Sequence, residues 1–311
     1  MTTALTPILV GVDNSAASDE AVRFAVREGK LRGLPVELVH STHYLYLPSR
    51  YGEAPLPASR ELNEYSQRSL AEAERAAAQA DPTVPVTVSV HDGDPIQYLL
   101  HRSTSAAAIV LGTHRMPTFW GALVRSIGQS VAAHAHCPVF LINHDQQAPR
   151  SDTPFVIVGV SPSAGGRQAL RFGFEEARER GIGLTAVRCA APIAWSSATA
   201  MGYGPYIYTD WDKTENAIMD ESMAGIAEEY PDVKVNRAVL NQSPTMALIS
   251  LAAGADLLVV GAHRRDEHWL SRLGPVASWL LHNAPCPLAV VGRSGAEATV
   301  APGARAGAAA G

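Results

Sequence analysis

The chain has 311 residues, of which 47% are apolar and 18% are charged, and its length leaves room for two domains that each bury a core. With 25 basic and 30 acidic side chains, it carries no general electrostatic attraction for nucleic acids or anionic membranes. No apolar run approaches the roughly 20 residues of a membrane span, and the first residues do not resemble a signal peptide. We therefore expect a cytoplasmic protein that binds neither nucleic acid nor membrane.

The first half of the chain alternates strand-like and helix-like segments. Apolar runs predict strands over residues 7–13, 35–42, 84–90, 107–112 and 138–142. Periodicity and end signals predict helices over residues 15–32, 58–80 and 126–136, and a short helix that Asp94 caps with Pro95 in its first position. Loops are predicted over 43–57 and 113–125. This alternation is typical of a parallel sheet covered by helices on both faces.

The second half repeats the first at an offset of 148 or 149 residues. Residues 8–13 recur as 156–161, residues 109–115 as 258–264, and residues 136–139 as 285–288. A period of this length indicates a duplicated domain rather than a solenoid unit. We predict an α/β fold of two flavodoxin-like (HUP-type), doubly wound parallel sheets in tandem, five strands each, related by a pseudo-two-fold axis. The domains would span 1–145 and 154–293, followed by a disordered Ala/Gly-rich tail over 294–311.

The last strand of each repeat would lie at a sheet edge. These strands, 138–142 and 287–291, are short and apolar, and exposed edges pair readily with other strands. We predict that the two edges pair with each other within one chain. A homodimer of the whole chain is compatible with the sequence, but no motif indicates it.

Cysteine and histidine give little sign of structural or catalytic chemistry. The three cysteines, Cys137, Cys189 and Cys286, are odd in number, and two precede apolar strands, which predicts reduced core thiols. The eleven histidines show no zinc-type spacing, so we expect no metal site. No nucleophile-elbow motif is present, and we do not expect an enzyme.

Glycine and polar residues follow the predicted strands of repeat 1. Ligands of open α/β sheets bind outside the carboxyl ends of the strands, where the strand order reverses. The sequence predicts that this crevice gathers segments that lie far apart along the chain: Gly11, Asp13, Asn14 and Ser15, the segment Val39–Thr42, and the loop from Gly112 to Ile127.

At these residues the chain resembles the universal stress protein family in its tandem form. The resemblance covers residues 5–292 and rests on the Val-Gly-Val-Asp-x-Ser opening at 10–15, the Gly93-Asp94-Pro95 turn, the Gly112 loop and the His-x-His-Cys-Pro-Val segment at 134–139. It implies stress-response regulation and binding of ATP, alone or with Mg²⁺, without a defined catalytic reaction. It also implies that Asp13 contacts the nucleoside and that the backbone at Val39 contacts the base.

The family's ATP-binding members share a loop of Gly, two residues, Gly, nine residues, Gly, then Ser or Thr. Glycines let the backbone approach phosphates, and the hydroxyl and a helix N-terminus complete an anion site. Repeat 1 keeps Gly112 and Ser126 but has Arg115 and Arg125 at the other two glycine positions. Guanidinium groups there could hold phosphate oxygens, or their bulk could block the phosphate path. The remaining loop positions of the predicted site are Thr113, His114 and Ile127.

Repeat 2 has lost more of this pattern. Gly261 and Gly274 survive, but Pro275 replaces the hydroxyl residue. Ser161 stands in place of Asp13, and Arg188 in place of His40. We expect the adenine nucleotide mainly in repeat 1. The alternatives are a stress scaffold that binds no nucleotide and acts through protein contacts, and a weak ATPase.

Repeat 2 also contains an insertion-like loop over residues 192–212 with two tryptophans and three tyrosines. Amphipathic aromatic side chains of this kind suit a lid or an interaction surface. They equally suit packing over the crevice of repeat 2 or the junction between the repeats. The sequence leaves both interpretations open.

Overall fold

The computed structural model describes residues 6–42, 59–113, 121–144, 151–190, 211–262 and 273–292. The side chains of residues 59–63 and 121–126 are not described. The predicted loop over 43–57, His114, Arg115, the aromatic loop before Trp211 and the tail over 294–311 lie outside the described residues.

Repeat 1 contains five strands and four helices among its described residues. They are β1 (Ile8–Val12), α1 (Ala16–Arg32), β2 (Val36–Ser41), α2 (Ser59–Ala80), β3 (Val86–His91), α3 (Pro95–Arg102), β4 (Ala108–Thr113), α4 (Gly121–His134) and β5 (Val139–Asn143). The prediction for the last helix was wrong at its start, because α4 begins at Gly121 and not at residue 126. The Ala-Leu-Val run that follows Gly121 continues the helix, so Ser126 lies inside it and does not cap it.

Repeat 2 follows the same order of elements. They are β6 (Phe155–Gly159), α5 (Ala164–Arg180), β7 (Gly183–Cys189), α7 (Trp211–Met223), α8 (Ile226–Glu229), β8 (Val235–Leu240), α9 (Pro244–Ala252), β9 (Leu257–Gly261), α10 (Pro275–Asn283) and β10 (Leu288–Val291). The predicted loop over 192–212 ends earlier than expected, because Trp211 and Asp212 already belong to α7.

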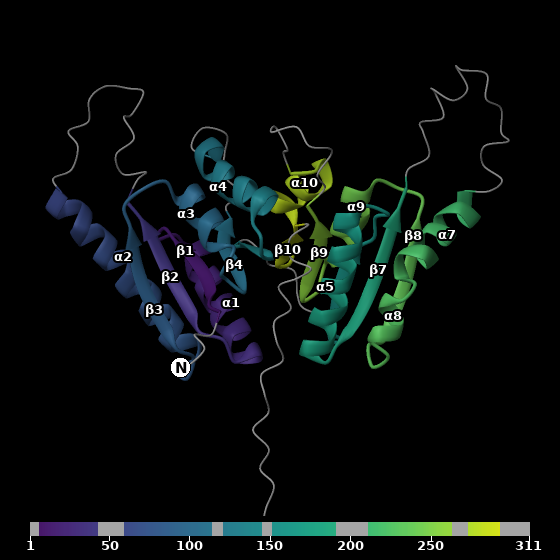
Figure 1. Cartoon of the computed structure of the whole chain (residues 1–311), viewed down its shortest axis with the longest axis horizontal. Helices are drawn as coiled ribbons and strands as arrows, with labels where there is room; N and C mark the ends of the chain where they lie inside the picture. Colours follow the sequence, from purple (N-terminus) through teal and green to yellow (C-terminus); the bar gives the residue numbers. More distant parts are fainter. Residues whose placement is uncertain are drawn as a thin grey trace, which may run out of the picture.

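The ten strands form one continuous sheet (Figure 1). Its order is β3-β2-β1-β4-β5-β10-β9-β6-β7-β8. All pairs within each repeat are parallel, whereas β5 and β10 pair antiparallel at the centre. The predicted pairing of the two edge strands within one chain is therefore confirmed, and the predicted doubly wound sheets join into a single sheet.

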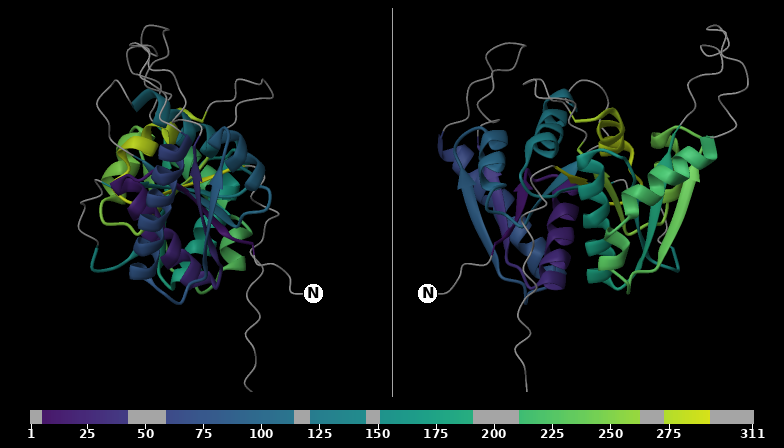
Figure 2. Two further views of the ribbon diagram at one scale, coloured as in Figure 1. Left: turned by 90° about the vertical axis from the view of Figure 1, so that its left-hand side faces the viewer. Right: turned by 45° about the vertical axis from the view of Figure 1, so that its right-hand side comes forward.

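Helices cover both faces of this sheet (Figure 2). Helices α1, α2, α5, α7 and α8 pack on one face, where the larger core includes Phe24, Leu70, Phe174 and Met219. Helices α3, α4, α9 and α10 pack on the other face over a second core that includes Leu99, Leu141 and Leu280. The carboxyl ends of the parallel strands lie between these two helix layers, which positions the site.

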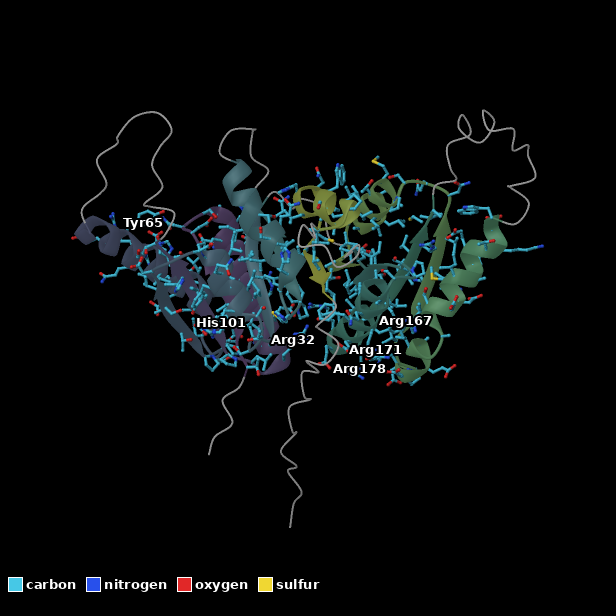
Figure 3. The ribbon with its side chains drawn as sticks, turned by 45° about the horizontal axis from the view of Figure 1, so that its top comes forward. Arg32, Tyr65, His101, Arg167, Arg171 and Arg178 are labelled. Atoms are coloured by element: carbon cyan, nitrogen blue, oxygen red, sulfur yellow. The ribbon has the colours of Figure 1, made fainter. Side chains whose placement is uncertain are left out.

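The two repeats also meet through helices α1 and α5. Their ends carry four charged side chains, Glu28, Arg32, Glu176 and Arg180, which we call the interface cluster. Arg180 lies 2.7 Å from Glu28 and 2.8 Å from Glu176, and Arg32 bonds both carboxylates as well. The four side chains are at most 16% exposed. Arg32 is visible at the junction in Figure 3.

The cysteine prediction is confirmed. All three thiols are free, and Cys137 and Cys286 are buried. Burial raises the pKa of each of these two thiols to about 12, so both stay protonated at neutral pH.

Candidate functional site

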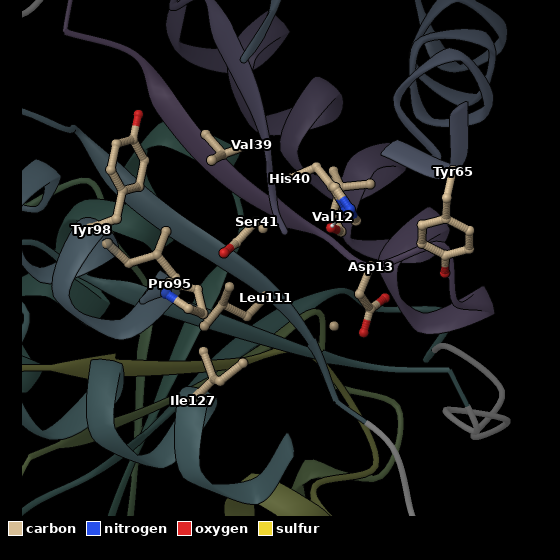
Figure 4. A pocket seen from close by; sticks show the side chains of 14 residues that line it. Val12, Asp13, Val39, His40, Ser41, Tyr65, Pro95, Tyr98, Leu111 and Ile127 are labelled. Atoms are coloured by element: carbon tan, nitrogen blue, oxygen red, sulfur yellow. Dashed lines mark hydrogen bonds between the residues drawn. The ribbon is translucent and has the colours of Figure 1, made fainter. Parts of the chain in front are cut away.

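A pocket of about 190 Å³ lies at the carboxyl ends of β1, β2 and β4 in repeat 1. The strand order of this repeat reverses between β1 and β4, which is where ligands of open α/β sheets bind. The lining comes from the end of β1 and from five further elements, β2, β4, α2, α3 and α4: Gly11, Val12, Asp13, Val39, His40, Ser41, Tyr65, Pro95, Tyr98, Leu99, Leu111, Gly112, Ile127 and Gly128. Figure 4 shows this lining from close by. Of the predicted site residues, the structure brings five together here: Gly11, Asp13, Val39, Gly112 and Ile127.

The carboxylate at the pocket entrance is held in place by the helix that follows it. Asp13 is exposed, and its Oδ1 accepts hydrogen bonds from the backbone N–H of Ser15 (3.1 Å) and from its hydroxyl (2.6 Å). Ser15 in turn caps α1, because its Oγ accepts from the N–H of Ser18. Asn14 makes the turn in the left-handed region, with φ of 63°. Both hydrogen bonds from Ser15 thus go to one carboxylate oxygen of Asp13, and they fix the orientation of the carboxylate.

A buried histidine forms the adjoining wall. His40 is 4% exposed, and its Nδ1 lies 2.8 Å from the carbonyl oxygen of Val12. A carbonyl can only accept, so Nδ1 carries the proton, and Nε2 in the neutral ring is an acceptor. Nε2 is buried, and no described residue of the chain forms a hydrogen bond with it. The ring of Tyr65, from α2, lies 5.9 Å from that of His40 and covers this side of the pocket (Figure 4).

The opposite side of the pocket is mostly apolar and includes a braced tyrosine. Tyr98 accepts a hydrogen bond from Arg102 (2.9 Å) and stacks on His91, with ring centroids 4.2 Å apart. Arg102 also binds Glu37 through two hydrogen bonds of 2.8 and 2.6 Å. The hydrogen bond from Arg102 lowers the pKa of Glu37, so the pair is charged at neutral pH. The first turn of α3 is in turn fixed by Asp94, which caps it as predicted.

Gly112, next to the last residue of β4, has a packing role. A Cβ at Gly112 would lie 2.5 Å from the carbonyl carbon of Ala17, so β4 can approach the start of α1 only with glycine there. Gly261 has the same constraint in repeat 2, where a Cβ would lie 2.6 Å from the carbonyl oxygen of Gly165. Both glycines are therefore explained without a phosphate, although they also leave the backbone accessible to one.

Other predicted positions contribute less to the pocket. Thr113 is buried and donates to the carbonyl oxygen of Ile142 (3.3 Å), so it does not line the pocket. Arg125 and Ser126 lie within α4, where only the backbone is described. The predicted helix start at residue 126 was wrong, because α4 begins at Gly121 and Ser126 lies within it. Gly274 precedes α10 and provides no side-chain cap.

The corresponding crevice of repeat 2 contains an ion pair. Arg188, in place of His40, donates to the carbonyl oxygen of Val160 at 3.4 Å, the counterpart of the carbonyl that His40 binds. Its Nε also lies 2.7 Å from Glu215 of α7. Both side chains are at most 15% exposed. In repeat 2 this position is thus partnered within the protein, whereas His40 keeps a buried acceptor to which no described residue donates.

Several lining residues were not predicted from the sequence. Tyr65 and Tyr98 come from helices, and Leu99, Leu111, Pro95 and Gly128 line the pocket beside them. The Asp94 cap could have indicated Pro95 and Tyr98, because it places the first turn of α3 next to the strand ends. Nothing local in the sequence of α2 indicates that Tyr65 faces the pocket.

Ten strands in this order, with a pocket at the switch point of one repeat, define a tandem doubly wound α/β protein. The model of the universal stress protein family matches residues 5–143 and again 155–292. The chain belongs to the universal stress protein family.

Relatives support this assignment over nearly the whole chain. A universal stress protein of Mycolicibacterium smegmatis is 31% identical over 290 residues, covering 91% of this chain and 96% of the relative. Universal stress protein Rv2623 of Mycobacterium tuberculosis is 30% identical over 303 residues, covering 92% and 96%. A crystal structure of a universal stress protein from Archaeoglobus fulgidus has a TM-score of 0.65 at 15% identity, covering 92% and 98%. This last similarity bears on the fold alone.

The described residues show neither a candidate membrane span nor a candidate metal site. Within these ranges, no helix combines the length and apolar character that crossing a bilayer requires. The same ranges hold no group of three or more His, Cys, Asp or Glu side chains placed to bind a metal ion.

Proposed function

We propose that this chain is a cytoplasmic stress-response regulator that binds an adenine nucleotide, ATP with or without Mg²⁺, in the pocket of repeat 1. The two repeats, 1–145 and 154–293, would act as a binding domain and its structural partner. The proposal rests on one observation above all: the pocket of repeat 1 combines an oriented carboxylate, a buried acceptor and an apolar wall at the switch point of the sheet.

The size and lining of the pocket fit a nucleoside better than a triphosphate. A volume of about 190 Å³ is below the roughly 300–1,000 Å³ that encloses a drug-sized ligand. The apolar side chains Val39, Leu99 and Ile127 suit the faces of a base. The second oxygen of Asp13 and Nε2 of His40 are acceptors that suit sugar hydroxyl groups. The phosphates would extend past Gly112 towards Arg115, Arg125 and Ser126.

Repeat 2 lacks several of these features, which supports a single site. Ala247 occupies the position equivalent to Tyr98, and Thr185 and Leu251 replace the bracing pair Glu37 and Arg102. The Arg188–Glu215 ion pair occupies the wall where repeat 1 has His40 and Tyr65.

Native mass spectrometry and calorimetry of the full chain test this proposal. We expect retained ATP or AMP, or ATP binding after its removal, at about one nucleotide per chain. Asp13→Ala should lower the affinity at least tenfold, since it removes the oriented carboxylate. The matched control is Ser161→Ala, the same position in repeat 2, which should leave the affinity unchanged.

Other results would select other functions. A wild-type chain that neither retains nor binds nucleotide would favour the scaffold that acts through protein contacts. Equal affinity for the wild type and Asp13→Ala would place the nucleotide elsewhere. We expect no turnover, and phosphate release over many cycles that is lost in Asp13→Ala would instead identify an ATPase.

A further inference from the structure

The strands that join the repeats meet at one pair of equivalent residues. In the antiparallel pair of β5 and β10, Phe140 lies directly opposite Ala289. These two residues also correspond to each other in the internal repeat, 149 positions apart. The pseudo-two-fold axis therefore passes between them. Residues directly opposite in an antiparallel pair project to the same face of the sheet, so the two side chains share one space.

The surroundings of this pair are alike on both sides of the axis. The interface cluster contributes the same two residue types from α1 and from α5, and each arginine bonds both carboxylates. Phe24 and Phe172 are also repeat equivalents, and both contact the ring of Phe140, with centroids 5.2 and 6.0 Å apart. These contacts would form equally well between two copies of the same repeat, because equivalent residues contribute the same groups.

The two residues of the pair on the axis differ strongly in size. Phe140 is 2% exposed and Ala289 is fully buried, and both belong to the same core. The neighbouring positions carry only branched aliphatic residues in both strands, so they do not distinguish the repeats. Two phenylalanines opposite each other would overfill this space, and two alanines would leave a cavity.

A second pair on the other face of the sheet follows the same rule. Gln129 of α4 and Ser278 of α10 are repeat equivalents, and the amide of Gln129 lies 3.4 Å from the hydroxyl of Ser278. A long side chain again meets a short one next to the axis. Two glutamines or two serines at this place could not form the same contact.

We propose that the Phe140–Ala289 pair makes the shared sheet edge selective for unlike repeats. Repeat 1 fits repeat 2, whether of its own chain or of a second copy, and neither repeat fits its own kind. The interface cluster attracts like and unlike repeats equally. The size match of the two side chains on the axis favours the pairing of unlike repeats. This inference does not depend on the proposed nucleotide site.

Single substitutions reproduce the like pairings within the intact chain. Ala289→Phe places phenylalanine opposite phenylalanine, as if repeat 1 met repeat 1. Phe140→Ala places alanine opposite alanine, as if repeat 2 met repeat 2. The double exchange, Phe140→Ala with Ala289→Phe, restores a large–small pair in reversed order, and Phe24 and Phe172 flank the ring in either place.

The measurement is thermal unfolding of the four full-length proteins. Each single variant should lower the Tm by roughly 5 °C or more, from overfilling or from a cavity. The double exchange should recover at least half of the summed loss. The control is the exchange of Ile142 and Val291, which are repeat equivalents but do not lie opposite each other. Its change in Tm should not exceed the sum of the changes in the two single variants.

Two results would overturn the proposal. One is a double exchange whose Tm falls by as much as the Tm losses of the two single variants added together. The other is an Ala289→Phe variant as stable as the wild type. If Ala289→Phe does not fold, the double exchange still decides: a folded double variant supports selectivity, and an unfolded one beside a folded Phe140→Ala variant contradicts it.

Discussion

The two repeats share a backbone and an interface but differ at the ends of their strands. In repeat 1, His40 binds the carbonyl of Val12 and leaves a pocket beside it. In repeat 2, Arg188 binds the equivalent carbonyl of Val160 and pairs with Glu215. The same backbone position therefore lines a pocket in one repeat and carries an internal ion pair in the other.

The contacts of the interface cluster explain why both repeats carry the same charged residues there. Each charged residue of the interface cluster touches both its own repeat and the equivalent residues of the other, so losing one leaves partners on both sides uncompensated. The hydrogen bonds of Asp13 and His40, by contrast, are formed within repeat 1. A substitution in the interface cluster therefore disturbs contacts in both repeats, whereas a substitution in a pocket disturbs contacts in one repeat.

The largest effect is expected at the interface cluster. Glu28→Gln and Glu176→Gln each leave two buried arginines short of a carboxylate, and we expect each to lower the free energy of unfolding by about 3–5 kcal/mol. Because the two positions are equivalent, the losses should agree to within about 1 kcal/mol. Urea unfolding of the full chain measures both.

The control for this prediction is an ion pair at the surface. Glu229 pairs with Arg171, and both side chains are at least 40% exposed, so Glu229→Gln should cost at most about 1 kcal/mol. A cost at Glu28 or Glu176 no greater than that of Glu229→Gln would show that the cluster does not hold the repeats together.

The next prediction converts one pocket wall into the other. His40→Arg with Ser66→Glu gives repeat 1 the arginine and the glutamate that repeat 2 carries at the equivalent positions, 188 and 215. We expect ATP affinity to fall at least tenfold, about 1.4 kcal/mol, because the longer side chains fill the pocket. Calorimetry of the full chain measures this loss, and circular dichroism checks that the variant is folded.

His40→Gln is the matched control for the converted wall. Glutamine can still donate to the carbonyl of Val12 and is no bulkier than histidine, so the affinity should stay within about threefold of wild type. Unchanged binding in the double variant would mean that this position does not explain the difference between the repeats.

The sequence predicted the fold well because the repeat supplied each signal twice. Strand runs, the Asp94 cap and the apolar edges at 138–142 and 287–291 led to the observed alternation of strands and helices and to the joined sheet. The predicted start of α4 was wrong because a serine can stand at the N-terminus of a helix or within it, and the sequence does not distinguish the two positions.

The candidate site was predictable only in part, for a physical reason. Asp13, Gly112 and Val39 lie at strand ends, and topology alone brings strand ends together. Tyr65 and Tyr98 reach the pocket through the rotation of α2 and α3 about their axes, which depends on packing. The packing role of Gly112 was likewise hidden, because the close approach of α1 is a tertiary contact.

The smallest effect is expected at the brace of Tyr98, which repeat 1 alone possesses. Glu37→Gln removes the charge that Arg102 binds and should lower the free energy of unfolding by about 0.5–1 kcal/mol at neutral pH. With Tyr98 less firmly held, ATP affinity should fall by about two- to threefold. Thr185→Val, the equivalent position in repeat 2, should change neither quantity beyond a few tenths of a kcal/mol.

The contribution of Glu37 should also depend on pH with a defined sign. Arg102 lowers the pKa of Glu37 in the folded chain below its ordinary value of 4.5, so the stabilisation is fully present above that pH. It is lost as the pH falls from about 4.5 through the lower folded-state pKa. The difference in unfolding free energy between wild type and Glu37→Gln should therefore shrink on acidification. A difference that stayed constant from pH 7 down to pH 3 would show that Glu37 contributes through packing and not through its charge.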